Sequence, residues 1–334
     1  MKVGVIGSGA MGTIFGLAMA RSGHDVLFYD VRPDLIAAIE QDGLRLEGVL
    51  GTFHFRAKAA LKPEQLGVID CALVAVDANA TPRAAKVAAS CLSSQGFALS
   101  LQNGIGNVEA LGEALGLERV VAGSTYNSGA TLGLARVLHS NAGPTWIGEA
   151  IGGSSERVCD LARRMTATGL PTTVSENVLS MIWSKFVHNC AINAVSAITG
   201  LRPGEIARNR SAAWIMEALL DEILAVVDRA GVDLPEHDSR AEIYDHAWER
   251  YNKPSMLQHL EAGRATEIDA LNGALVKKAR SLGIAAPVNA TIAAIVKGIE
   301  AQRQMRSDNP VIDEAAMELS ARSNPRAGRW DTNG

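Results

Sequence analysis

The stretch VGVIGSGAMG, residues 3–12, decides the fold, because a β-branched run leads straight into three glycines spaced G-x-G-x-x-G. Gly7 permits a tight turn off the strand, Gly9 lets a pyrophosphate approach the backbone, and Gly12 lets the next helix pack closely on the strand. The N-terminus of that helix offers free N–H groups and a partial positive charge to phosphates. We expect the loop to bind a dinucleotide through these residues: Gly7, Ser8, Gly9, Ala10, Met11 and Gly12.

The residues that follow favour this interpretation over a plain glycine turn. Residues 14–20 are apolar and compatible with a helix, Gly23-His24 is typical of a turn, and residues 26–29 are typical of a second strand. That strand ends at Asp30, about 20 residues beyond the glycines, where an acid would bond the hydroxyls of the adenosine ribose. The N-terminal region therefore predicts a Rossmann-type dinucleotide site.

Length and composition limit the class of protein. A chain of 334 residues exceeds a typical single domain, and 47% apolar and 20% charged residues describe a globular protein with an ample core. The net charge of −4 argues against a nucleic-acid surface. No apolar run approaches the roughly 18 to 20 residues that cross a bilayer, and a strand so close to Met1 leaves no room for a signal peptide. We expect neither nucleic-acid nor membrane partners.

The four cysteines are scattered among small or apolar residues, and neither they nor the seven histidines show metal-ligand spacing. We expect reduced, buried thiols in a cytoplasmic protein and no metal site. The cysteines are Cys71, Cys91, Cys159 and Cys190.

The first half of the chain alternates strand-like and helix-like segments, which predicts a doubly wound, mostly parallel sheet over residues 1–174. Further strands and helices are expected at 68–76, 81–92, 97–101, 108–114, 120–123, 154–168 and 171–174. The glycine-punctuated segments 136–139 and 144–148 predict an antiparallel or mixed edge on that sheet.

Helical periodicity with few β-branched runs begins near residue 175 and predicts an all-helical domain over residues 175–334. Its helices are expected at 176–200, 212–230, 242–251, 266–282 and 286–304. The polar end, 305–334, is expected to be partly mobile. Substrates of such two-domain proteins bind in the cleft at the carboxyl ends of the strands.

A polar stripe marks the helix expected at 176–200. Lys185, Asn189 and Asn193 are spaced by four residues, so their side chains share one face of an otherwise apolar helix. The stripe either faces solvent or lines a polar site. Asparagine is a poor helix former, and an exposed face normally carries varied charges, so the pattern favours a site.

Two further clusters follow from position. The Thr266–Asp269 spacing is similar to a capping box, which would place Glu267 in the first turn of a helix and leave Ser255 in the preceding loop. Asn103 directly follows a strand of the sheet, which predicts a position near the nicotinamide end of a bound dinucleotide. The alternative for Asn103-Gly104 is a plain turn.

Together these motifs resemble the ketopantoate reductases over essentially the whole chain to about residue 304. The resemblance is carried by G-x-G-x-x-G at 7–12, QNG at 102–104, W-x-K at 183–185 with the two asparagines that follow, PSM at 254–256, and GRATEID at 263–269. LNG at 271–273 and GIAAP at 283–287 also match. The resemblance implies a Rossmann domain followed by an all-α domain of the 6-phosphogluconate-dehydrogenase C-terminal type.

The resemblance also implies a reaction, the reduction of a 2-oxo acid to an (R)-2-hydroxy acid by hydride transfer from a nicotinamide. Lys185 would be the general acid that protonates the carbonyl oxygen, which suits an ammonium beside a developing alkoxide. Asn189, Asn193 and Ser255 would bond the hydroxyl and carboxylate of the substrate. Glu267 would lie near Lys185 and the nicotinamide, and Asn103 would orient the reacting carbonyl.

Two positions depart from the NADPH-using members of that family. Those members carry a basic residue just after the second strand, where this chain has Asp30 and Val31, with Arg32 one place further. Many also carry a lysine where this chain has Asp77. An acid at the first position bonds a ribose diol and repels a phosphate. The sequence therefore predicts a preference for NAD(H) over NADP(H), with Arg32 weighing against it.

These departures leave other functions open. The chain could be an NAD-dependent dehydrogenase of another 2-hydroxy acid, working in the oxidative direction of a catabolic pathway. An opine-type dehydrogenase would use a His–Asp pair, but His188 is not on the Lys185 face. A non-catalytic NAD sensor would need no proton donor. Helical domains of this kind often form homodimers, and the apolar helix at 286–296 is the expected contact.

Overall fold

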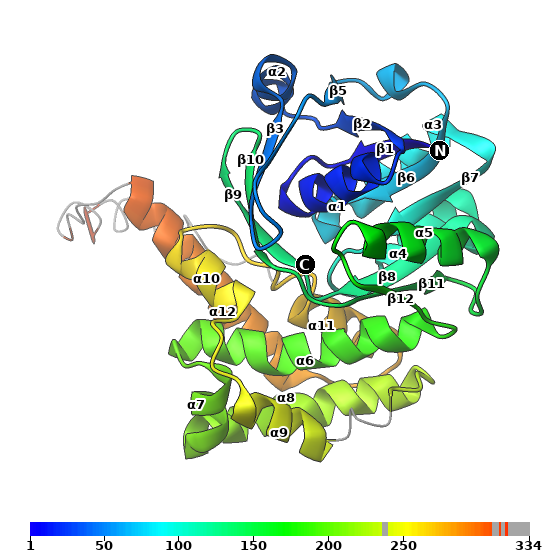
Figure 1. The fold of residues 1–334 in the computed structure, drawn as a ribbon. Helices are drawn as coiled ribbons and strands as arrows, with labels where there is room; N and C mark the ends of the chain where they lie inside the picture. The colour runs from blue at the N-terminus through cyan, green and yellow to red at the C-terminus, as the bar shows by residue number, and fades with distance from the viewer. Residues whose placement is uncertain (236–239, 309–313, 315–317, 320–334) are drawn as a thin grey trace.

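The computed structural model describes residues 1–235, 240–308, 314 and 318–319, and it comprises an α/β half and a helical half (Figure 1). The strand β1 (Lys2–Ile6) lies inside an eight-stranded sheet of order β12-β11-β8-β7-β6-β1-β2-β5. Its neighbours β2 (Asp25–Tyr29) and β6 (Ile69–Val74) both run parallel to it. The other strands of this sheet are β5 (Lys58–Ala60), β7 (Leu92–Ser100), β8 (Val120–Thr125), β11 (Thr145–Glu149) and β12 (Thr172–Val174).

The chain builds the sheet outward from β1 in one direction and then restarts at β6 in the other. This reversal leaves a crevice at the carboxyl ends of β1 and β6, which is where open α/β sheets bind ligands. Within the described part of the sheet, β11 pairs antiparallel with β8 and β12 pairs parallel with β11, so these two edge strands run opposite to the other six. The sheet is the doubly wound, mostly parallel one that the sequence predicts.

Helices cover both faces of the sheet, because successive side chains of its strands point to opposite sides and both sides are apolar. Val3 and Val5 belong to the core under α1 (Ala10–Arg21) and α5 (Glu156–Ala167). Ile6 belongs to the core under α3 (Thr81–Cys91) and α4 (Asn107–Leu115). The helix α2 (Pro33–Asp42) packs beside β5, and short 3₁₀ turns η1 (Pro63–Leu66), η2 (Ala78–Ala80) and η3 (Leu117–Arg119) connect these elements.

A second, four-stranded sheet of order β4-β3-β10-β9 corrects part of the sequence prediction. The segment expected at 136–139 is β10 (Arg136–Asn141), and it pairs with β3 (Leu44–Gly48) and β9 (Ser128–Gly133) instead of joining the edge of the main sheet. The fourth strand is β4 (Phe53–Phe55). This small sheet packs its apolar face on α1. Such a pairing between residues far apart in sequence leaves no local pattern.

The helical half is organised around α6 (Val178–Thr199), which contacts α8 (Arg210–Arg229), α10 (Ser255–Glu261) and α12 (Pro287–Asp308). The other helices are α7 (Pro203–Arg208), α9 (Arg240–Glu249) and α11 (Asn272–Ser281). One apolar core joins them. Figure 1 shows α6 lying beneath the α/β half, between it and α8. The boundary predicted after residue 174 falls between β12 and α6, and it stays a prediction.

Several predictions for this half need correction. The helix expected at 266–282 begins at Asn272, and α7 and α10 were not expected. Ile292 and Val296, on the helix expected as a dimer contact, are buried in the core of this half. Of the tail predicted to be mobile, 305–308 continue α12, and most of the remainder lies outside the described residues.

Two further observations concern the whole chain. Three cysteines are buried as expected, but Cys159 on α5 is exposed, and all four are free thiols. Among the residues that the structure describes, no helix is long and apolar enough to cross a membrane.

Candidate active site

The glycine loop between β1 and α1 has the geometry that a dinucleotide needs. Gly7 has φ +98°, which favours glycine, and a Cβ on Gly12 would lie 2.0 Å from the carbonyl oxygen of Gly7. By contrast, a Cβ on Gly9 would meet no protein atom within 4 Å, so the space beside this residue is open. The first turn of α1 contains no acidic side chain to oppose a phosphate. These residues fit a nicotinamide dinucleotide, whose pyrophosphate would lie at Gly9 and the N-terminus of α1.

Asp30 lies at the end of β2, 8% exposed, and connects this loop to the second strand. Its Oδ2 accepts a hydrogen bond from the backbone N–H of Ser8 at 2.9 Å. Its Oδ1 accepts from the backbone N–H of Arg32 at 3.1 Å and from the Arg32 Nε at 3.2 Å. Arg32, the residue that weighs against a preference for NAD(H), is therefore paired with Asp30.

Lys185 reaches from α6 across to the α/β half. Its Nζ donates to the Oδ1 of Asn103 at 2.7 Å and to the backbone carbonyl of Thr125 at 2.5 Å. The same Nζ lies 5.4 Å from the ring centroid of Tyr126. The sequence can indicate Asn103 as a partner of Lys185, because its side chain is polar. It cannot indicate the carbonyl of Thr125, because any residue could supply a backbone oxygen. Thr125 and Tyr126 were not among the predicted site residues.

Asn103 connects Lys185 to the helical half. Its Nδ2 donates to both carboxylate oxygens of Glu267, each at 3.1 Å. The two loops approach closely, since a Cβ on Gly104 would lie 2.4 Å from the carbonyl oxygen of Ala270. Lys185, Asn103 and Glu267 thus form one hydrogen-bonded line across the two halves, with Asn103 bound to both partners.

Neighbouring amides hold the Asn103 loop in place. The Nδ2 of Asn107 donates to the carbonyl of Asn103 at 3.0 Å, and Thr81 donates its hydroxyl to Asn107 at 2.8 Å. The Nε2 of Gln102 donates at 2.7 Å to the carbonyl of Val76, two residues after β6. Asn103-Gly104 is therefore more than a plain turn, because its side chain and its loop are both fixed by hydrogen bonds.

Burial sets the protonation behaviour of Lys185. Removal from water lowers the pKa of the ammonium from its usual value to about 8, and the negative charge of Glu267 opposes this by raising it. A lysine with a pKa near 8 can donate and accept a proton within an ordinary pH range. The position of Lys185 thus suits acid–base chemistry.

The remaining predicted substrate residues lie around this centre without a bond to it in the described part of the chain. Asn189 and Asn193 continue the Lys185 face of α6, and the Nδ2 of Asn193 donates to the Oδ1 of Asn189 at 3.2 Å. Both side chains are half-buried. Ser255 is exposed and begins α10, which packs on α6, so it lies in a helix and not in a loop.

The turn that carries Glu267 differs from the capping box that the sequence predicts. The Oγ1 of Thr266 accepts from the N–H of Ile268 at 3.2 Å, and Asp269 pairs with Lys297 of α12 at 3.0 Å. Because α11 begins only at Asn272, Glu267 lies in the turn before the helix. Because Glu267 lies outside the helix, its carboxylate can accept hydrogen bonds from Asn103.

Asp77 follows β6 and is exposed at the same edge of the sheet. It lies close enough to His259 of α10 for its charge, like that of Glu267, to favour the protonated ring. Burial and the charge of Arg264 nonetheless lower the pKa of His259. The charge of Asp77 therefore acts on α10 from the α/β half.

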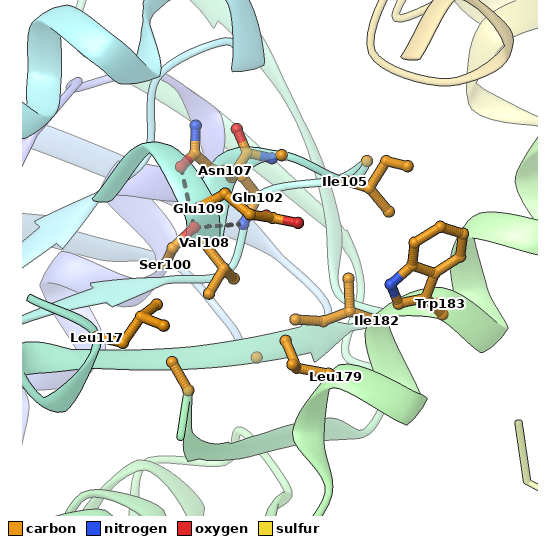
Figure 2. A pocket seen from close by; sticks show the side chains of 14 residues that line it. Ser100, Gln102, Ile105, Asn107, Val108, Glu109, Leu117, Leu179, Ile182 and Trp183 are labelled. Atoms are coloured by element: carbon orange, nitrogen blue, oxygen red, sulfur yellow. Dashed lines mark hydrogen bonds between the residues drawn. The ribbon is translucent and has the colours of Figure 1, made fainter. Parts of the chain in front are cut away.

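A small cavity of about 130 Å³ lies beside the Asn103 loop, against α4 and α6 (Figure 2). The side chains of Leu179, Ile182 and Trp183 form its α6 wall. Lys185 and Asn103 do not line it, so the cavity is separate from the hydrogen-bonded line.

Comparisons with known proteins agree with this geometry. A family model described as "Ketopantoate reductase PanE/ApbA" matches residues 3–152, and "Ketopantoate reductase PanE/ApbA C terminal" matches residues 177–300. The 2-dehydropantoate 2-reductase of Archaeoglobus fulgidus is 34% identical over 304 residues, which is 90% of this chain and 98% of that protein.

Solved structures are similar over the same length. A PanE/ApbA family ketopantoate reductase from Ralstonia eutropha JMP134 is 34% identical, with a TM-score of 0.80 over 91% of this chain and 100% of the other. A D-mandelate dehydrogenase, solved with NADH and anilino(oxo)acetate, is 23% identical and shares the fold, with a TM-score of 0.81 over 91% of this chain and 100% of the other.

Proposed function

The chain belongs to the ketopantoate reductase family, and we propose that it reduces 2-dehydropantoate to the (R)-2-hydroxy acid with a reduced nicotinamide cofactor. The observation that carries this proposal is the line from Lys185 through Asn103 to Glu267. It holds one ammonium at the carboxyl edge of a dinucleotide-binding sheet. A carbonyl that accepts a hydride there develops negative charge on oxygen, and the ammonium is the group that can neutralise it.

Lys185 acts as the proton donor in this proposal. Its Nζ already donates to two fixed oxygens, on Asn103 and Thr125, which leaves its third N–H for the carbonyl of the substrate. Proton transfer from Nζ to the alkoxide oxygen leaves a neutral amine. Because the pKa of Lys185 is lowered, this transfer is more favourable than it would be from an exposed lysine. In the oxidative direction the neutral amine would take the proton back.

Asn103 and Glu267 have the second role. The Asn103 amide, bonded to Lys185 and to Glu267, orients the ammonium, and in this proposal it also orients the reacting carbonyl of the substrate. The Glu267 carboxylate keeps Lys185 protonated in the free enzyme, because its charge raises the pKa of the ammonium against the effect of burial. Removal of either side chain would leave Lys185 less well placed or less charged.

Asn189, Asn193 and Ser255 bind the substrate in this proposal. The two asparagines lie on the Lys185 face of α6, and they offer amide donors and acceptors that suit the hydroxyl and carboxylate of a 2-oxo acid. Ser255 is exposed at the start of α10, on the helix that packs beside them. Since both asparagines continue the face of α6 that carries Lys185, the carboxylate would bind close to the reacting centre.

The cofactor would be held by the glycine loop, with Asp30 and Arg32 at the ribose end of the site and Asp77, Asn103 and Glu267 toward the mouth. When bound, the reduced nicotinamide supplies the hydride. We propose that NADH is preferred over NADPH, because the negative charges of Asp30 and Asp77 would both repel the 2′-phosphate of NADPH. Arg32 opposes this only weakly, since its guanidinium is already paired with Asp30.

The assembly and compartment are also proposals. We propose a homodimer in the cytoplasm, with the four free thiols kept reduced. The exposed side chains of Trp214 and Ile295 are available on the surface of the helical half, whereas Ile292 and Val296 on the expected contact helix are buried in the core. Light scattering after size exclusion would measure the mass directly.

Initial rates with 2-dehydropantoate, measured with NADH and NADPH in parallel, test the function and the cofactor preference together. We expect turnover with both cofactors and a higher kcat/KM with NADH. Faster turnover with NADPH would refute the role given to Asp30 and Asp77 but support the reaction. Absence of turnover with either cofactor would refute 2-dehydropantoate as the substrate, and other 2-oxo and 2-hydroxy acids would then be assayed.

A further inference from the structure

The main sheet has a neck where the chain leaves it and returns. The strand β8 ends at Thr125, the small-sheet strands β9 and β10 follow, and the chain rejoins the main sheet at Thr145, the first residue of β11. Thr125 and Thr145 are directly paired in the antiparallel register of β8 and β11. The backbone N–H of Tyr126 also donates to the carbonyl of Pro144 at 2.9 Å, which closes the neck.

Four buried polar side chains bond to one another inside this neck. They are Thr125, Asn127, His139 and Thr145, with exposures of 2%, 6%, 0% and 0%. The hydroxyls of Thr125 and Thr145 bond to each other at 2.8 Å. The Nδ2 of Asn127 donates to the Thr125 hydroxyl at 2.9 Å and to the carbonyl of Gly143 at 2.8 Å. The bonded groups of such a buried network hold one another in place, because a broken bond would leave a polar group without water or partner. Among the described residues, the Nδ1 of His139 is the one nitrogen or oxygen of these four side chains that lacks a partner.

His139 ties the small sheet into the same network. Its Nε2 lies 2.9 Å from the Oδ1 of Asn127, and since an amide oxygen only accepts, Nε2 carries the hydrogen. Burial lowers the pKa of His139, which agrees with a neutral ring in this place. The histidine comes from β10, so the network spans both sheets of the α/β half.

The network matters because of what Thr125 does with its backbone. Its carbonyl oxygen accepts from Lys185 Nζ at 2.5 Å, while its hydroxyl also accepts from the backbone N–H of Asn127 at 3.1 Å. We propose that the Thr125–Asn127–Thr145–His139 network positions Lys185 for proton transfer by fixing this carbonyl. The network residues do not touch the substrate or cofactor in this account, so they are positioning residues. The inference rests on the role proposed for Lys185.

The direction of the effect follows from hydrogen bonding. A carbonyl oxygen accepts a stronger hydrogen bond from the ammonium than from the neutral amine, so the bond favours the charged form of Lys185. Among the residues that the structure describes, the other charged or titratable groups near Nζ are Glu267, through Asn103, and the ring of Tyr126. Loosening the network should therefore lower the pKa of Lys185 below about 8 and also misplace the proton donor.

The test compares two Thr→Val substitutions in the same half of the molecule. Thr145→Val removes a network hydroxyl, whereas Thr168→Val removes a buried hydroxyl that donates to the Met165 carbonyl, outside the network. For Thr145→Val we expect kcat for reduction to fall roughly tenfold with little change in KM. We also expect the alkaline limb of its pH profile to move to lower pH. Thr145→Ser should restore both, and Thr168→Val should change neither.

The inference would be overturned if the alkaline limb of the reduction rate fell at the same pH in Thr145→Val and Thr168→Val. It would also be overturned if Thr145→Ser did not restore the wild-type pH profile. Asn127→Ser, which shortens the amide but keeps a polar group, gives the same readout if Thr145→Val does not fold. Lys185→Ala separates the two levels of the argument. Unchanged turnover in that variant would refute the role of Lys185 on which the inference rests but not the reaction, whereas the Thr145 result bears only on positioning.

Discussion

The cofactor loop and the Lys185 centre lie at the same edge of the main sheet but are built in opposite ways. The loop is contiguous: Gly7, Gly9, Gly12 and Asp30 lie within the first thirty residues, and backbone geometry decides what each can be. The Lys185 centre joins residues 82 and 164 positions apart along the chain, and side-chain hydrogen bonds hold it together. Substitutions should therefore act on stability and cofactor binding in the first region, and on turnover in the second.

Lys185→Ala gives the largest expected effect on the second region. We expect kcat for 2-dehydropantoate reduction to fall by about 10² to 10⁴, because the proton donor is lost from the transition state. Binding of the cofactor, followed by its fluorescence, should stay within about twofold of the wild-type protein.

The matched control is Lys58→Ala, which removes an exposed lysine that pairs with Asp25 on the surface. Such pairs contribute little, so activity should stay unchanged. A Lys185→Ala enzyme with near wild-type kcat would contradict the claim that the Lys185 centre controls turnover.

A pair of glycine substitutions separates folding from binding in the first region. Gly12→Ala forces a Cβ to within 2.0 Å of the Gly7 carbonyl, and we expect a loss of about 1 to 3 kcal/mol in the free energy of unfolding together with weaker cofactor binding. Gly9→Ala places its Cβ in open space, so stability should hold while the Kd for the cofactor rises at least about tenfold, because the methyl group occupies the pyrophosphate site. Thermal unfolding and cofactor titration distinguish the two, and equal stability losses would contradict the account.

Glu267→Gln sharpens the electrostatic part of the second region. Glu267 raises the pKa of Lys185, so its neutral replacement should lower that pKa below about 8. Reduction requires the ammonium, and the rate should therefore decline at lower pH than in the wild-type enzyme, while the amide can still accept from Asn103. The pH dependence of kcat/KM measures this shift, and an alkaline limb at unchanged or higher pH would show that the Glu267 charge does not act on Lys185.

Arg32→Ala has the smallest expected effect, because the guanidinium is half-exposed and already paired with Asp30. We expect no more than about a threefold change in the ratio of kcat/KM for NADH and NADPH. A change of about a hundredfold against NADPH would instead make Arg32 a phosphate ligand and weaken the proposed preference for NADH.

The sequence predicts the contiguous region better than the dispersed one. The glycine spacing and the apolar strands of residues 1–30 are local signals, and the doubly wound sheet that they predict is confirmed. The segment 136–139 was wrongly predicted at the edge of the main sheet, and the small sheet was not predicted, because β10 pairs with β3 across about ninety residues and no local pattern marks this pairing.

The site shows the same division. The four-residue spacing of Lys185, Asn189 and Asn193 predicts a shared helix face, and the family motifs indicate Asn103 and Glu267, whose roles remain proposals. The Thr125 carbonyl left no signal, because its contribution is a backbone atom. The helix predicted at residue 266 was wrong because a threonine followed by an acid also occurs in a non-helical turn, here fixed by contacts with α12.

The most direct test of the central claim, that Lys185 is the proton donor, is the pH dependence of kcat/KM in both directions between about pH 6 and about pH 10. Reduction needs the ammonium and oxidation needs the neutral amine. The account predicts that reduction falls and oxidation rises with increasing pH, both through one pKa near 8 that is absent in Lys185→Ala. The account would be contradicted if the rates of reduction and oxidation changed in the same direction with pH, or if a change near pH 8 persisted in Lys185→Ala.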